Sequence, residues 1–234
     1  TPSSSSAASD VYKRQEVGND FAISIKMNSA DFQKGGFSPE DSIQVAKLFS
    51  DSGIDNIEIS GGTYEQPRLL GLDKVSINPK RSENRKESTI AREAYFLSYA
   101  EEIAKVVNIP LMVTGGFRTK EGMEAALRDG ACEIVGVGRP LCANPYAIKE
   151  LLSGQIDELP KYEKTLSIGP WWLSPTSPFR LIQAINAFSA QAWFYQQIKK
   201  MGKGLMPDLN LKPWKAFRED AKADQEAIKE YQNF

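Results

Sequence analysis

Two short glycine turns are the residues of this chain whose types and spacing could do chemistry. The first, residues 114–119 (TGGFRT), and the second, residues 137–140 (VGRP), each follow an apolar run and precede a helical pattern. Glycine lets backbone N–H groups approach an anion closely, and the positive end of a following helix adds to the attraction. In (β/α)8 barrels the loops after the last two strands commonly hold a phosphate in this way. The turns therefore predict a site for a phosphorylated ligand, with ordinary strand-to-helix turns as the alternative.

Composition excludes several classes of function. The sequence contains no histidine, which removes a Ser-His-Asp hydrolase and any metal site that needs imidazole within this chain. The 30 acidic and 29 basic residues nearly balance, so we expect no general affinity for nucleic acid or an anionic membrane. No apolar run approaches the roughly 20 residues that span a bilayer. We expect a cytoplasmic protein without a metal, in which Cys132 and Cys142 are reduced thiols.

The elements that must position the turns alternate between strand and helix. Period-two alternation indicates strands, and capping residues with apolar residues at helical spacing indicate helices. Four such units predict parallel strands with crossover helices, about half of the ~250 residues of a (β/α)8 barrel. A flavodoxin-like open sheet is the competing architecture, although its phosphate sites usually follow the first strand. The expected strands are 21–27, 54–60, 110–114 and 133–137, and the expected helices are 38–53, about 88–107, 119–128 and 144–154.

The chain divides into three parts on this reading. Residues 1–15 lack periodicity and a signal-peptide core, and we interpret them as a non-native or disordered leader. Residues 16–154 form the βα part, which includes a long polar stretch at 61–87 of the kind that covers a site or is disordered. Residues 155–234 form a linker and a helical extension, with helices expected at 179–201 and 213–231. Trp171 and Trp172 in the linker could form an interface or lid, but such aromatics more often pack on the domain beneath them.

Five ordered blocks resemble a known family. They are residues 25–32 (IKMNSADF), 57–64 (IEISGGTY), 92–96 (REAYF), 114–118 (TGGFR) and 136–140 (GVGRP). In this order and spacing they resemble the C-terminal half of the Old Yellow Enzyme family, the NAD(P)H:flavin oxidoreductases. The resemblance runs from Phe21 to Gly154 and continues through residues 204–209. It implies an α/β fold formed by the last four βα units of a TIM (β/α)8 barrel, with FMN at the carboxyl ends of the strands.

The resemblance also assigns binding residues. A guanidinium can pair bidentately with phosphate oxygens, and backbone N–H groups suit a dianion. Lys26 is implied to lie near the N1/O2 edge of the flavin, and its alternative role is an ion pair with Glu58 on the neighbouring strand. Asn28, Asp31 and Ser60 are weaker candidates that could instead cap loops. The positions that match the family's phosphate-binding turns are Gly115, Gly116, Gly138 and Arg139.

The implied reaction is that of an ene-reductase. NAD(P)H reduces FMN, and the reduced flavin passes a hydride to an activated C=C bond, as in an enone. The family's substrate clamp, a His/Asn or His/His pair, has no counterpart here, and neither Tyr64 nor Tyr95 sits at the family's proton-donor position. We therefore expect an N-terminally truncated half that carries no catalytic residues, is inactive alone, retains flavin weakly and self-associates through open sheet edges.

Two other functions stay open at this point. A phosphate-binding barrel lyase or isomerase would share the late glycine turns but not the blocks at 57–64 and 92–96. A non-catalytic fragment would bind FMN or a partner chain without turnover. A flavin absorbance spectrum separates the flavoenzyme from the lyase, and NADPH oxidation with an enone acceptor separates it from the non-catalytic fragment.

Overall fold

A computed structural model describes residues 13–31, 36–60 and 96–232 of the chain. The long polar stretch at 61–87, the start of the expected helix at 88 and the candidate tyrosines Tyr64 and Tyr95 lie outside the described residues. The chain splits into two compact units, residues 1–137 and 138–234, which are described separately below. This division falls earlier than the expected boundary at residue 154, where the alternation of strands and helices stops in the sequence, and that boundary stays a prediction.

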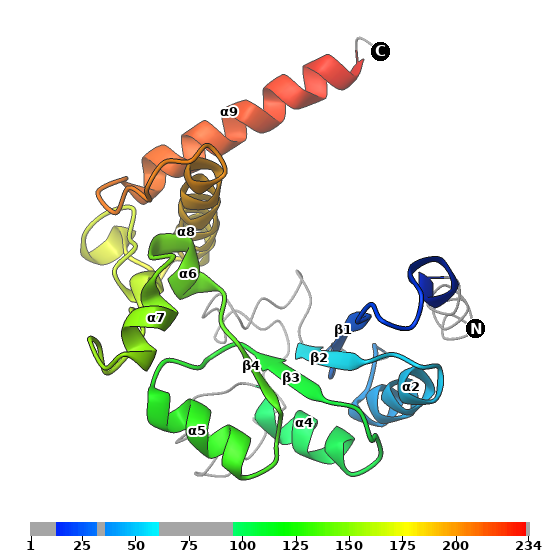
Figure 1. The fold of residues 1–234 in the computed structure, drawn as a ribbon. Helices are drawn as coiled ribbons and strands as arrows, with labels where there is room; N and C mark the ends of the chain where they lie inside the picture. Colours follow the sequence, from blue (N-terminus) through cyan, green and yellow to red (C-terminus); the bar gives the residue numbers. More distant parts are fainter. Residues whose placement is uncertain (1–12, 32–35, 61–95, 233–234) are drawn as a thin grey trace. The chain divides into compact units, whose positions relative to one another are not determined.

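The first unit is a parallel sheet with helices along one face (Figure 1). Its strands lie in the order β1-β2-β3-β4, so each strand pairs with the next one along the chain. Sequential parallel order is the topology of consecutive barrel units, whereas a flavodoxin-like sheet changes direction after its first strands. The α/β prediction is confirmed, with the strands β1 (Ser24–Asn28), β2 (Asn56–Ser60), β3 (Leu111–Thr114) and β4 (Ile134–Gly136) and the helices α2 (Pro39–Asp51), α4 (Leu97–Ala104) and α5 (Lys120–Arg128).

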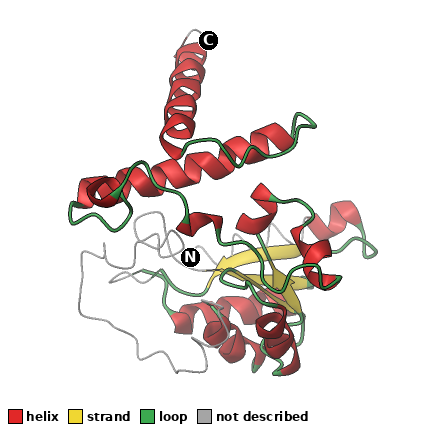
Figure 2. Ribbon diagram, turned by 90° about the vertical axis from the view of Figure 1, so that its left-hand side faces the viewer, coloured by secondary structure: helices red, strands yellow, loops and turns green. Residues whose placement is uncertain are grey.

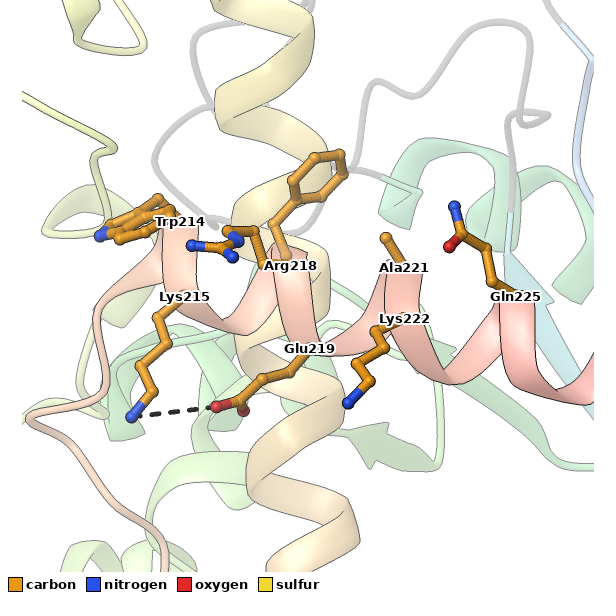
Figure 3. A pocket seen from close by; sticks show the side chains of 8 residues that line it. Trp214, Lys215, Arg218, Glu219, Ala221, Lys222 and Gln225 are labelled. Carbon is orange, nitrogen blue, oxygen red and sulfur yellow. Dashed lines mark ion pairs between the residues drawn. The ribbon is translucent and has the colours of Figure 1, made fainter.

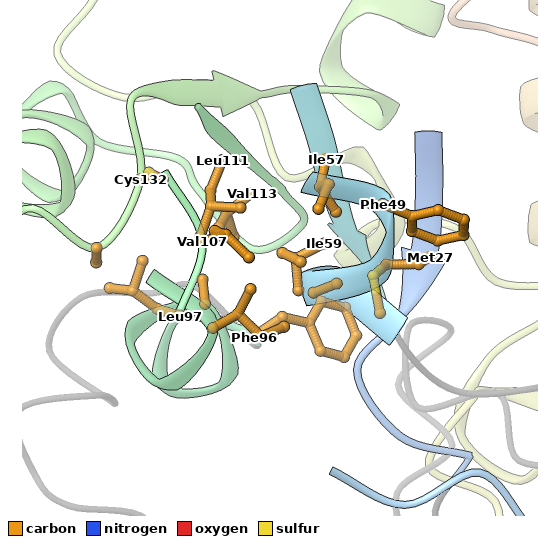
Figure 4. Packing of buried hydrophobic residues seen from close by; sticks show 14 of the residues in the cluster. Met27, Phe49, Ile57, Ile59, Phe96, Leu97, Val107, Leu111, Val113 and Cys132 are labelled. Atoms are coloured by element: carbon orange, nitrogen blue, oxygen red, sulfur yellow. The ribbon is translucent and has the colours of Figure 1, made fainter. Parts of the chain in front are cut away.

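Alternation along the strands sends every second side chain into the core of the first unit. Ile57 and Ile59 on β2 and Val113 on β3 are fully buried, and they pack with residues of α2 and α4 such as Phe49 and Leu97 (Figure 4). The opposite face of the sheet carries polar side chains near β1 and β2. The expected first strand was too long at its start, because pairing begins at Ser24 and leaves Phe21 exposed.

Local signals set the helix ends as the sequence predicted. The Ser38 hydroxyl accepts from the backbone N–H of Asp41 at 3.1 Å, and the Asp41 carboxylate accepts from the backbone N–H of Ser38 at 3.0 Å. This capping box, with Pro39 in the first turn, starts α2. Gly53 follows α2 with a φ of 81°, a left-handed conformation that favours glycine.

Part of the expected leader contacts the first unit. Arg14 donates hydrogen bonds to the carbonyl oxygens of Gly18, Phe21 and Gly53, and it forms an ion pair with Asp55. Residues 13–17 are helical. The end of the expected leader therefore packs on the fold, while residues 1–12 lie outside the described part of the chain.

The second unit is helical (Figure 2). The expected helices at 179–201 and 213–231 are confirmed as α8 (Arg180–Met201) and α9 (Pro213–Gln232). The connection between them is fixed by buried side chains of α8, since Trp193 Nε1 donates to the carbonyl of Leu211 at 2.9 Å and Gln197 bonds both backbone groups of Asp208. Shorter helices precede them, α6 (Arg139–Ala143) and α7 (Ala147–Leu152). The sequence analysis did not predict α6.

Trp171 and Trp172 do not pack as such aromatics usually do. They lie in a single 3-10 turn, Trp171–Leu173, where Trp171 has a φ of 39° and is 85% exposed. Across residues 13–31, 36–60 and 96–232, no helix combines the length and the apolar character needed to cross a membrane.

Candidate functional site

The carboxyl ends of the strands form one edge of the sheet in the first unit. Asn28 pairs in register with Ser60 at the ends of β1 and β2, and Thr114 pairs with Gly136 at the ends of β3 and β4. The first glycine turn starts directly after Thr114, and the chain continues from Gly136 into the second. Both turns therefore leave the sheet from neighbouring strand ends, as the prediction of a phosphate site requires.

The first turn needs its two glycines for their backbone conformation. Gly115 has a φ of 119° and Gly116 a φ of 90°, values that residues with a Cβ rarely adopt. Helix α5 begins only at Lys120, after the Thr119 hydroxyl accepts from the N–H of Gly122 at 3.1 Å. The amides of Gly115 and Gly116 therefore belong to the turn itself, and the helix begins where the sequence predicted, at residues 119–120.

Thr114 is a residue of this turn that the sequence analysis did not single out. Its Oγ1 is buried and has no hydrogen-bond partner within the part of the chain that the structure describes. A buried hydroxyl without a partner is costly, and it often marks a place where a ligand or water completes the site. The neighbouring Gly136 is required for a different reason, since a Cβ there would lie 1.9 Å from Thr114 Oγ1.

Arg118 also went without a role in the sequence analysis. Its side chain belongs to the first turn, is only 6% exposed, and donates to the carbonyl of Phe117 at 2.7 Å. A buried guanidinium places a fixed positive charge beside the turn, since arginine stays protonated in proteins. Residue spacing gave no signal for this burial, because arginine in a turn is usually solvated.

The second turn differs from the first. Gly138 has a φ of −112°, which other residues adopt, and a Cβ there would meet nothing within 4 Å. Open space beside this backbone, rather than an unusual conformation, is what a closely approaching anion would use. The helix that follows, α6, has only 5 residues, so its few aligned peptide dipoles add less than the sequence analysis expected.

Arg139 begins α6 and lies near an acidic partner in the second unit. One of its guanidinium nitrogens lies 3.9 Å from Glu163 Oε1, and its side chain is 26% exposed. Arg139 is therefore a partly buried cation with a distant carboxylate. The two turns lie in different units, so their convergence on one phosphate stays a prediction.

Lys26 makes the ion pair that was its alternative role. It lies opposite Glu58 in the register of β1 and β2, with Nζ 2.7 Å from Glu58 Oε1. The lysine side chain is 56% exposed and the glutamate 19%, and exposed pairs contribute only about 0–1 kcal/mol. The pair therefore orients Lys26 without preventing it from meeting a second anionic group.

The weaker candidates support the loop after β1. The amide nitrogen of Asn28 donates to Asp31 Oδ1 at 3.1 Å, and Asp31 Oδ2 accepts from the backbone N–H of Phe37 at 3.0 Å. Asp31 thus caps a loop, as short polar residues often do. Ser60 ends β2 and is half-buried.

The cysteines do not supply a nucleophile. Both are free, as expected. Burial raises the pKa of Cys132 to about 11, and burial also raises the pKa of Cys142. A thiol with a raised pKa stays protonated near neutral pH and reacts slowly.

Comparisons with known proteins find flavin and NADH oxidoreductases that are similar to part of the chain. An NADH-dependent flavin oxidoreductase of Hypocrea jecorina is 39% identical over 144 residues, which are 59% of this chain and 33% of that protein. An NADH oxidase of Thermoanaerobacter brockii is 30% identical over 188 residues, which are 80% of this chain and 26% of that protein. The chain thus spans about a third or less of the length of these curated relatives.

The solved structures include a partial match, and no family model matches the chain. The structure titled as an Old Yellow Enzyme homologue from Zymomonas mobilis aligns with a TM-score of 0.39 and 20% identity. The alignment covers 62% of this chain and 34% of that one.

Proposed function

We propose, on the premise that the part of the chain matched by these relatives belongs to the Old Yellow Enzyme-like flavin oxidoreductases, that it is the phosphate-holding half of an FMN-dependent oxidoreductase of the ene-reductase type. NADH is the proposed reductant, because both curated relatives are named for it. The proposed acceptor is an activated alkene such as an enone.

The phosphate of FMN would bind at the glycine turns. Gly115 and Gly116 have positive φ and lie before the start of α5, so their amides are part of the turn. Gly138 offers open space beside its backbone, and Arg139 offers a partly buried guanidinium. The unpartnered hydroxyl of Thr114 and the fixed charge of Arg118 fit an anion at the same strand end. The residues present therefore fit a phosphate dianion.

Lys26 would lie near the flavin ring, at the end of the cofactor away from the phosphate. It stands on the polar face of β1, oriented by Glu58 at 2.7 Å. Nζ carries three donors, so it can keep the Glu58 bond and hold a second acceptor. A bound flavin supplies hydride transfer between NADH and the acceptor, and a cation near its N1 edge would favour the charge that develops there.

This half of the barrel would bind FMN without completing the reduction of the acceptor. With no histidine in the sequence, it lacks the imidazole donors expected to hold a carbonyl or nitro oxygen. Among the described residues no cysteine is activated. We therefore propose that the isolated chain binds FMN weakly and does not oxidise NADH with an enone acceptor. Turnover at a rate well above that of free FMN would contradict this part of the proposal.

The observation that carries the proposal is the first turn. Two glycines with left-handed φ follow a strand end whose register partner begins the second turn. The test is a titration of FMN followed by its fluorescence, with the chain and its Arg139→Gln variant. Loss of the guanidinium should weaken FMN binding at least ~10-fold, which is about 1.4 kcal/mol.

A matched control accompanies this titration. Arg128→Gln removes an arginine that is 72% exposed and lies 3.8 Å from Asp129, a similarly distant carboxylate. This variant should bind FMN as the unaltered chain does. Equal affinity of both variants would remove Arg139 from the site, and tight binding of a sugar phosphate without FMN binding would favour the lyase or isomerase.

A further inference from the structure

Helix α9 carries a repeat of seven residues that the proposed function does not use. Lysine recurs at positions 215, 222 and 229, and glutamate at positions 219 and 226. On the other side of the helix, a stripe is formed by residues that are spaced alternately three and four positions apart. Such a repeat is typical of helices that pair with another helix. The stripe, called the α9 seam below, consists of Trp214, Phe217, Ala221, Asp224, Ile228 and Tyr231.

The α9 seam is exposed in the second unit. The beginning of α9 packs on α8, where Ala216 is fully buried and Lys199 pairs with Asp220 at 2.6 Å. From Ala221 to Tyr231 every residue is exposed, including Ile228 at 56% and Tyr231 at 84%. Helices of this length are only marginally stable in water without packing, so this half of α9 would gain stability from a partner.

The two sides of α9 differ in chemistry (Figure 3). A recess of about 550 Å³ runs from the seam, along Trp214, Phe217 and Ala221, to the charged residues Lys215, Glu219 and Lys222, which also line it. The other side carries the repeated charges, which form pairs one turn apart, Lys215 with Glu219 at 3.9 Å and Lys222 with Glu226 at 3.7 Å. These pairs stabilise the helix itself, and they leave the seam as the side that a partner helix would cover.

We propose that α9 pairs with α9 of a second copy of this chain in antiparallel orientation. The seam begins and ends on large apolar residues and has small or charged ones at its centre. In antiparallel pairing Trp214 lies opposite Tyr231 of the second copy and Phe217 lies opposite its Ile228. Asp224 then lies opposite Ala221 of the second copy, where the small side chain leaves the carboxylate access to water.

The charge of Asp224 favours the antiparallel orientation over the parallel one. In a parallel pair each seam residue would face its own copy, so two Asp224 carboxylates would meet in the middle of the seam. Like charges in contact are unfavourable at an interface. The antiparallel pair avoids that contact and keeps the opposing residues on both halves apolar.

The experiment measures association of the full chain by sedimentation over a range of concentrations. The chain should be in reversible equilibrium between monomer and dimer. Ala221→Asp places a second carboxylate opposite Asp224 of the partner, so the dissociation constant should rise at least ~10-fold. Ala223→Asp is the matched control, because Ala223 is equally exposed but lies outside the seam, and it should leave association unchanged.

Orientation is tested by a third variant. Ala221→Lys places an ammonium opposite Asp224 of the partner in the antiparallel pair, and the dimer should persist. In a parallel pair the same variant would bring two lysines together and weaken the dimer. A chain that stays monomeric, or one that associates equally after Ala221→Asp and Ala223→Asp, would overturn the proposal. Circular dichroism should show unchanged helix content in all three variants. FMN binding plays no part in this test.

Discussion

At the scale of single residues, the glycines at the two strand ends are not all required for the same reason. Gly115 and Gly116 need glycine for their positive φ, and Gly136 needs it because of the neighbouring Thr114 hydroxyl. Gly138 has neither constraint. Residue type alone therefore does not distinguish a structural glycine from one that makes room for a ligand, whereas the surrounding atoms do.

Gly136→Ala should destabilise the first unit. The added methyl would fall 1.9 Å from Thr114 Oγ1 and 2.8 Å from Met112 Cε, and overpacking of this kind costs about 1–3 kcal/mol. Urea unfolding measures the loss. Gly138→Ala is the control, because the same methyl meets open space there, and its free energy of unfolding should change by less than about 0.5 kcal/mol. Equal effects of the two substitutions would contradict the described packing.

At the scale of elements, the cap at Ser38 fixes the start of α2. Ser38→Ala removes the hydroxyl that accepts from Asp41 N–H at 3.1 Å, and it should lower the free energy of unfolding by about 1 kcal/mol. Ser52→Ala at the other end of the helix removes only an exposed bond to the Leu48 carbonyl, so thermal unfolding should separate the two variants. A Ser52→Ala loss as large as that of Ser38→Ala would argue against the capping box.

The same cap makes α2 sensitive to acid. Hydrogen bonds from the Ser38 backbone and hydroxyl hold the pKa of Asp41 below its ordinary value of 3.8. A group whose pKa falls on folding contributes stability above its unfolded pKa and loses it as the pH drops through its folded pKa. The stability difference between the chain and its Asp41→Asn variant should therefore narrow between pH 7 and pH 2.5. A difference that stays constant with pH would show that the carboxylate charge contributes nothing.

Sequence patterns predicted the elements whose positions are set by local interactions. Alternation placed Ile57 and Ile59 in the core, and capping residues placed the starts of α2 and α5. They missed α6, because five residues after a glycine turn give no helical period, and they missed the buried states of Thr114 and Arg118. Burial of these two side chains depends on which strand ends lie side by side. Strand pairing in the sheet determines that, and the spacing of residues along the chain does not reveal it.

At the scale of the whole molecule, the described sheet ends on two edges. Within the described residues β1 pairs only with β2, and β4 pairs only with β3. Exposed edges favour pairing with other chains, so self-association through them stays a prediction alongside the α9 pair. The Ala221→Asp variant distinguishes them, because it should weaken the α9 pair and leave edge association unchanged.

The central claim is that this chain recognises the phosphate of FMN. Riboflavin carries the same ring and side chain without the phosphate, so a comparison of the two ligands isolates that contact. Fluorescence titrations of the full chain should show FMN binding at least ~10-fold more tightly than riboflavin, a difference of about 1.4 kcal/mol. Equal affinities for FMN and riboflavin, or binding of neither, would contradict the account.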